Sequence, residues 1–131
     1  MNLKNIIDAR EAVARLAALR FTNYKTTRAV AKLRKAVENE YEVYAETERK
    51  CVLAYAEIND HGTPAFLPDG RLKLKGPEAK AAFEKEITSA LETEISEVET
   101  ISLHASDFPD GAEFPSPEDI IILEPLVQFE D

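Results

Sequence analysis

The chain has few of the residues on which most enzymes and metal sites depend. Its 131 residues include one cysteine, two histidines, four glycines and no tryptophan. A single cysteine excludes an internal disulfide, and we therefore expect a reducing, intracellular compartment. With four glycines in all, no phosphate-binding loop or paired-glycine fingerprint occurs, and no serine has nucleophile-elbow context. The sequence predicts a protein that is not an enzyme, with no catalytic residue, cofactor or metal.

Long apolar runs are also missing. The longest, Ile120-Ile121-Ile122-Leu123, is far too short to cross a bilayer, and residues 1–5 form no apolar signal-peptide core. We therefore expect a soluble protein with no membrane partner. Hydrophobic residues make up 44% of the chain and charged residues 31%, which is typical of a folded protein with a highly charged surface. The length predicts a single domain over residues 1–131.

Basic residues are scarce after residue 35. The net charge is −9, yet Met1 to Lys35 holds nine basic and two acidic residues, and the rest holds seven basic and twenty-three acidic ones. Such a split is typical of a binding surface or of association between unlike faces. The alternative is that the two halves of the chain pack together and partly neutralise each other.

The stretch from Tyr24 to Ile58 contains no glycine or proline, so the sequence predicts one long helix there. At 1.5 Å of rise per residue it would be roughly 50 Å long. A compact chain of this length is only about 35–40 Å across, so we expect the helix to overhang its own domain. Apolar residues recur every seven positions and indicate a coiled-coil-type seam that pairs with other helices. The predicted protein interface on this seam is Val37, Tyr41, Tyr44 and Cys51.

The remaining pattern predicts an α+β fold. A helix over residues 3–20 and a short connection favour a long antiparallel helical hairpin over residues 1–59. An α+β portion follows over residues 60–131. It contains a β-hairpin around Pro68-Asp69-Gly70, a third helix from Glu78 to about Glu94, and a third strand over residues 98–103. We expect these strands to form a small antiparallel sheet. Ser116 and Pro117 then begin a short C-terminal helix.

Two further surfaces carry candidate chemistry. Arg28, Lys32 and Lys35 share a helical face, which could be a phosphate footprint for nucleic acid. Against nucleic acid stand the negative net charge and the lack of a known reading motif, and an acidic surface that mimics DNA is the opposite hypothesis. The segment from His104 to Glu113 holds several oxygen ligands, but it lacks the spacing of a calcium loop and is more typical of an acidic turn.

The chain resembles a group of small uncharacterised proteins encoded by bacteriophages and prophages, a family with no assigned activity. The matching segments are Leu16 to Tyr24, Ala29-Val30-Ala31-Lys32-Leu33, Tyr41 to Glu48, Tyr55 to Gly62, Phe83-Glu84-Lys85-Glu86-Ile87, Ser116-Pro117-Glu118-Asp119, Leu123-Glu124-Pro125-Leu126 and Phe129-Glu130. The resemblance implies a viral gene context, with the cytoplasm of a bacterial host cell as the expected location, and it implies no functional residues. We expect a non-enzymatic interaction or assembly protein that acts through its long helix, as a homo-oligomer or with a phage or host protein. Nucleic-acid binding and DNA mimicry are the alternatives.

Overall fold

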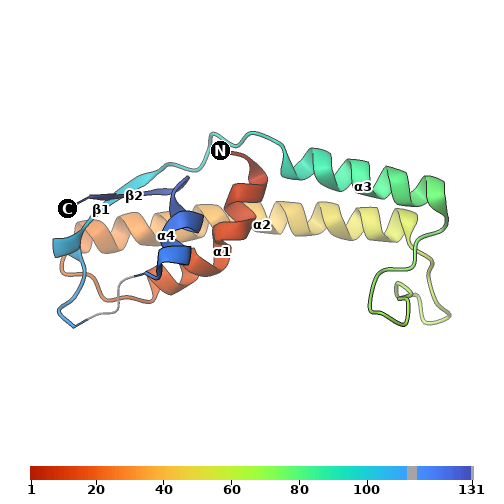
Figure 1. Ribbon diagram of the computed structural model, residues 1–131, viewed down its shortest axis with the longest axis horizontal. Helices are drawn as coiled ribbons and strands as arrows, with labels where there is room; N and C mark the ends of the chain where they lie inside the picture. Colours follow the sequence, from red (N-terminus) through yellow and green to blue (C-terminus); the bar gives the residue numbers. More distant parts are fainter. Residues whose placement is uncertain (112–114, 131) are drawn as a thin grey trace. The chain divides into compact units, whose positions relative to one another are not determined.

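The computed structural model describes residues 1–111 and 115–130, and the described part is mixed helix and strand (Figure 1). This confirms a fold with both helices and strands. The elements in chain order are α1 (Leu3–Ala17), α2 (Tyr24–Tyr55), α3 (Pro77–Leu91), β1 (Ile101–His104), the 3-10 helix η1 (Ala105–Asp107), α4 (Pro117–Leu123) and β2 (Val127–Glu130). The long helix forms as one continuous element, as the lack of glycine and proline predicts, and the short C-terminal helix also forms.

The chain divides into two compact units. Unit 1 comprises Met1–Tyr41 and Glu94–Asp131, and unit 2 comprises Glu42–Thr93. Residues 24–41 of α2 therefore belong to unit 1, and residues 42–55 belong to unit 2. In this division the third helix groups with the end of α2, and the last thirty-eight residues group with the N-terminus. The single domain over residues 1–131 stays a prediction.

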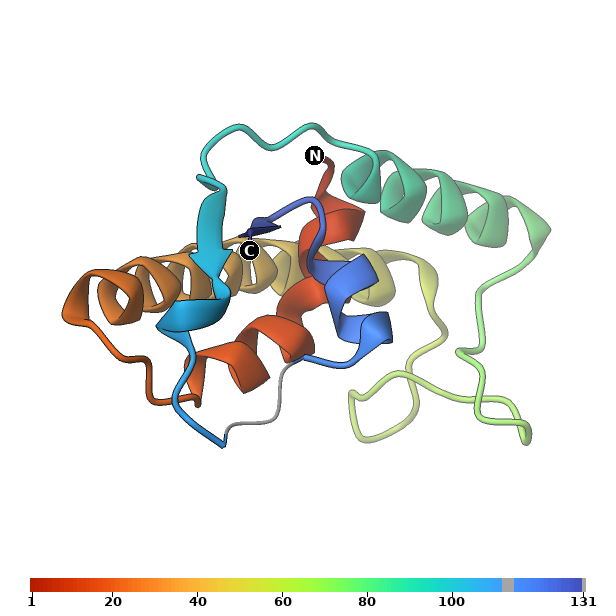
Figure 2. The same ribbon diagram turned by 60° about the vertical axis from the view of Figure 1, so that its left-hand side comes forward.

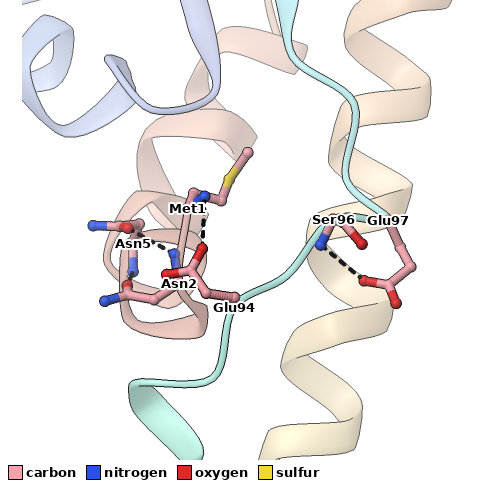
Figure 3. A network of polar contacts seen from close by, with 6 residues as sticks. All are labelled: Met1, Asn2, Asn5, Glu94, Ser96 and Glu97. Carbon is pink, nitrogen blue, oxygen red and sulfur yellow. Dashed lines mark hydrogen bonds and ion pairs between the residues drawn. The ribbon is translucent and has the colours of Figure 1, made fainter.

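α1 begins at a capping box in which the side chains of Asn2 and Asn5 each accept a hydrogen bond from the other's backbone N–H (Figure 3). The buried face of α1 is apolar and consists of Leu3, Ile6, Ala9, Ala12, Val13 and Leu16. The predicted antiparallel hairpin is wrong, because α1 crosses α2 (Figures 1 and 2). In an antiparallel hairpin, Arg10 would lie opposite residues near Ala31. Instead the Arg10 guanidinium pairs at 3.0 Å with the carboxylate of Glu38, which is about two helical turns further along α2. α1 also packs against α4, where Arg15 pairs with Asp119 at 2.6 Å.

The sheet of unit 1 consists of β1 and β2, which are parallel (Figure 1), in the register Ile101↔Val127 to His104↔Glu130. The prediction of an antiparallel sheet is therefore wrong. The physical reason is α4, which lies between the two strands in the sequence and returns the chain to the end where β1 began. The predicted third strand corresponds to β1, and the apolar C-terminal segment supplies its partner.

The predicted β-hairpin does not form as a pair of strands. The segment has three isolated antiparallel bridges, Ala56↔Leu74, Ile58↔Pro64 and Phe66↔Leu72. The predicted turn is present, since the Gly70 N–H donates to the Leu67 carbonyl at 2.9 Å and Gly70 has a φ of 88°. Pro64 and Pro68 each lack an N–H donor, which limits how far a regular ladder can extend.

The core of unit 1 joins α1, the first half of α2, the sheet and α4. Side chains that are almost wholly buried come from each of these elements: Ile6, Val13, Val30, Val37, Leu103, Leu123 and Leu126. Phe21 and Phe108 meet edge to face, with ring centroids 5.5 Å apart. The first part of α2 is thus fixed beside β1.

Asp107 in η1 ties the connection before α2 to the end of β1. Its carboxylate accepts hydrogen bonds from the His104 N–H at 2.9 Å and from the Asn23 side chain at 3.0 Å. The bond from the His104 backbone, followed by that from Asn23, lowers the pKa of Asp107. The Asn23 side chain in turn accepts from the Thr26 N–H and caps the start of α2. The position of the α2 N-terminus therefore depends on Asn23 and Asp107.

In unit 2, α3 lies beside the end of α2. The Lys75 N–H donates to the Tyr55 carbonyl at 2.9 Å, so α3 begins where α2 ends and runs in the opposite direction. Glu86 of α3 accepts hydrogen bonds from the side chains of Cys51 and Tyr55. No helix in the described ranges is long and apolar enough to span a membrane.

Candidate functional site

The residues of the predicted seam lie mostly inside the chain. Val37, Tyr44 and Cys51 are buried, and Tyr41 is half-buried with the Arg10 guanidinium 3.8 Å from its ring centre. In unit 2, Glu86 of α3 contacts Cys51 through a hydrogen bond. The prediction that α2 overhangs its own domain did not include this contact. Self-association of the chain stays a prediction, but these buried positions no longer carry it.

Cys51, Tyr55 and Glu86 form a polar cluster between α2 and α3. The Tyr55 hydroxyl and the Cys51 thiol donate to the Glu86 carboxylate at 2.6 Å and 3.0 Å. These two bonds, with that of Tyr55 the larger, lower the pKa of Glu86. Burial first, then the hydrogen bond to Glu86, raises the pKa of Cys51 to about 11. A protonated thiol is a weak nucleophile, so the cluster is structural and supplies no catalytic cysteine.

We expect the Cys51 thiol to react with iodoacetamide near pH 8 at least about a hundredfold more slowly in the folded protein than in urea, because its thiolate is that much rarer. Glu86→Gln should speed alkylation, since it removes the charge that disfavours the thiolate. The folded thiol titrates near pH 11 and the unfolded thiol near its ordinary 9.0, so stability should fall as the pH rises from 9 to 11. Mass spectrometry gives the rate, and equal folded and unfolded rates would contradict this placement of Cys51.

A row of cations runs along one face of α2 in unit 1. Lys25, Arg28, Lys32 and Lys35 follow one another at intervals of three or four residues and are exposed. None of the four forms an ion pair with any residue that the structure describes. Arg10 and Arg15, by contrast, pair with Glu38 and Asp119, and these partners raise the pKa of both guanidinium groups. We call the four unpaired residues the cationic stripe.

The stripe borders a groove of about 410 Å³ in unit 1. One side of this groove is α2, and the other is the segment that enters β1. Its apolar lining comes from Ala29, Leu33 and Ala36 of α2 and from Ile101 of β1. Lys25, Arg28 and Lys32 also line it, whereas Lys35 continues the row beyond it. The groove thus combines an apolar floor with a cationic wall, and we call it the α2–β1 groove.

Glu97 and Glu99 form the opposite wall of the α2–β1 groove. The segment that carries them is held at its start, because the N-terminal amine of Met1 lies 3.4 Å from the Glu94 carboxylate (Figure 3). The Ile95 N–H also donates to the Met1 carbonyl at 2.9 Å. Neither glutamate forms an ion pair with a described residue across the groove, so the two charged walls are separate.

Of the residues singled out from the sequence, the structure brings Arg28 and Lys32 together in the groove. Their helical spacing is the signal that found them. Sequence reasoning missed Lys25, Glu97 and Ile101, and for the last two no local pattern places them beside α2. Within residues 1–111 and 115–130, no cluster of three metal-ligating side chains occurs. Glu113 of the candidate metal segment lies outside the described residues.

Comparison with protein-family models, curated proteins and solved structures found no match. What the site can do therefore follows from its chemistry. An apolar floor beside a row of cations suits a ligand that has apolar groups and negative charges together. Among the described residues that line the α2–β1 groove there is no serine, cysteine, histidine or aspartate.

Proposed function

We propose that this protein is a non-enzymatic interaction protein that binds an acidic segment of another protein in its α2–β1 groove. The observation that carries the proposal is the cationic stripe, a row of exposed cations beside an apolar groove that form no ion pair with any residue in the described ranges. Such a surface attracts a negatively charged partner over a distance and orients it for docking. The apolar floor then gives a protein segment contact area that a purely ionic surface lacks.

The charge balance of the whole chain supports this proposal. The chain has twenty-five acidic and sixteen basic residues, so carboxylates are in excess. Arg10, Arg15, Arg49 and Arg71 have carboxylate partners within the chain. The four neighbouring cations of the stripe have no such partner among the described residues and repel each other, and Lys25, in the first turn of α2, also opposes the helix dipole. An acidic partner would remove both costs.

Nucleic-acid binding is the second candidate, and the same stripe favours it. Lys25, Arg28, Lys32 and Lys35 could contact consecutive phosphates. Glu97 and Glu99 count against it, because a phosphate backbone carries a denser charge than a peptide and would meet two carboxylates in the groove. We therefore place protein binding first. The resemblance to phage and prophage proteins adds the proposal that the partner is a phage or host protein.

The test compares two labelled ligands by fluorescence anisotropy. One is a seven-residue peptide with alternating glutamate and valine, acetylated and amidated, which we call the acidic probe; the other is a short DNA duplex. We expect the acidic probe to bind, with an affinity that falls as salt rises from about 50 to about 200 mM. A lysine–valine peptide of the same length is the control and should not bind. Binding of the duplex alone would overturn the proposal in favour of nucleic acid.

A further inference from the structure

We propose that the partner segment binds in extended form and adds a third strand to the sheet, alongside β1. The occupant is a peptide segment of another protein, with carboxylates on one face and apolar side chains on the other. Strand addition rests on the proposed function, since it names the form in which the acidic segment occupies the α2–β1 groove. It adds a claim of its own: backbone hydrogen bonds, as well as charge, hold the partner.

The outer edge of β1 is open at Ser102, whereas the His104 N–H, which faces the same edge, already donates to the Asp107 carboxylate. The described sheet has two strands, so β1 has β2 on one side only. The Ile101 N–H donates to the Leu126 carbonyl at 3.0 Å, which shows that Ile101 directs its backbone groups toward β2. Alternate residues of a strand face opposite edges, so the N–H and C=O of Ser102 point away from β2. Ser102 is exposed, and its backbone groups have no hydrogen-bond partner among the described residues.

The α2–β1 groove adjoins the start of β1, where Ile101 lines it and directly precedes Ser102. The residues that line it come from α2 and from the chain at the start of β1, and none comes from β2. The four residues of β1 span about 13 Å, and the α2 residues that line the groove, Lys25 to Ala36, span about 17 Å. One added strand of four or five residues therefore fits the length of both walls. It would also cover an edge that is open to unwanted pairing.

The charges select the chemistry of the added strand. Lys25, Arg28 and Lys32 are on the wall far from β1, and their long side chains can reach carboxylates of a strand that lies between them and β1. Apolar side chains on its other face would rest on Ala29, Leu33 and Ala36. A second groove of about 580 Å³ lies beside β2, under Ile120 and Ile121, but no cation lines it and nothing there selects an occupant.

The experiment uses the acidic probe in two N-methylated forms, because N-methylation removes an N–H donor and keeps every charge. In one form the valine amides are methylated, and in the other the glutamate amides. Only one set of amides can face β1, so we expect one form to bind at least about tenfold more weakly and the other to bind about as well as the parent. Equal binding by both forms, or equal loss in both, would overturn strand addition.

A variant of the protein tests the same bond from the other side. Ser102→Pro removes the free N–H and no ladder bond, and proline is tolerated at a sheet edge. We expect Ser102→Pro to weaken binding of the acidic probe about tenfold, while the control Ser102→Ala binds the probe like the wild type. If Ser102→Pro does not fold, the methylated peptides decide on the unaltered protein. If Lys32→Glu weakens binding while methylation and Ser102→Pro have no effect, strand addition is wrong and the proposed function stands. If Lys32→Glu has no effect on binding, the proposed function itself is wrong.

Discussion

Reversing three cations of the stripe, in the variant Arg28→Glu, Lys32→Glu and Lys35→Glu, should weaken binding of the acidic probe about a hundredfold. Each exposed ion pair contributes little by itself, but reversal replaces attraction with repulsion at three neighbouring positions. None of the three side chains has an ion-pair partner within the described part of the chain, so the variant loses no internal contact of that kind. Isothermal titration calorimetry of the variant and the wild type measures the difference.

The matched control reverses three cations of unit 2, in the variant Lys50→Glu, Lys80→Glu and Lys85→Glu. These residues are also exposed, and the change in net charge is the same. We expect the control to bind the acidic probe within about twofold of the wild type, because none of its three cations lines the groove. If both variants lose affinity equally, net charge governs binding and the stripe has no special role. The thermal midpoints of both variants show whether each one folds.

Val37→Asp should lower the free energy of unfolding by more than about 3 kcal/mol, because it places a carboxylate without a partner in the core of unit 1. The Val37 side chain is 0% exposed. The same change at Val43, which is 67% exposed on the same helix, should alter stability by no more than about 0.5 kcal/mol. Urea unfolding measures both.

The same pair of variants separates a core from an interface. If Val37 belonged to a seam between copies, Val37→Asp would yield a folded monomer from a larger assembly. Burial within one chain predicts instead that Val37→Asp unfolds. It also predicts that the Val43→Asp variant has the same mass by light scattering as the wild type. A folded Val37→Asp monomer from an oligomeric wild type would restore the seam hypothesis.

Local patterns predicted what depends on neighbours along the chain. The lack of glycine and proline between Tyr24 and Ile58 predicted a continuous α2, and the structure confirms it up to Tyr55. The interval between Arg28 and Lys32 predicted a shared face, and both line the α2–β1 groove. In each case the 3.6-residue period of the helix fixes the geometry without any tertiary contact.

Features that depend on distant segments could not be predicted. The direction of β2 relative to β1 follows from how α4 returns the chain, and the strand patterns alone do not contain that information. Glu86 of α3 accepts a hydrogen bond from Cys51, 35 positions earlier in the sequence. The prediction of an exposed seam on α2 did not include this contact with α3. The groove itself joins Ile101 to Leu33, and no periodicity links two residues so far apart in the sequence.

The most direct test of the central claim is a nuclear magnetic resonance titration of ¹⁵N-labelled protein with the acidic probe. If the partner adds a strand beside β1 and contacts the cationic stripe, the amide signals that move should be those of Lys25 to Ala36 and of Glu97 to Ser102, with Ser102 among the largest shifts. Amides of unit 2, such as those of Tyr44 and Cys51, should stay in place. Shifts confined to unit 2, or spread evenly over both units, would contradict the account.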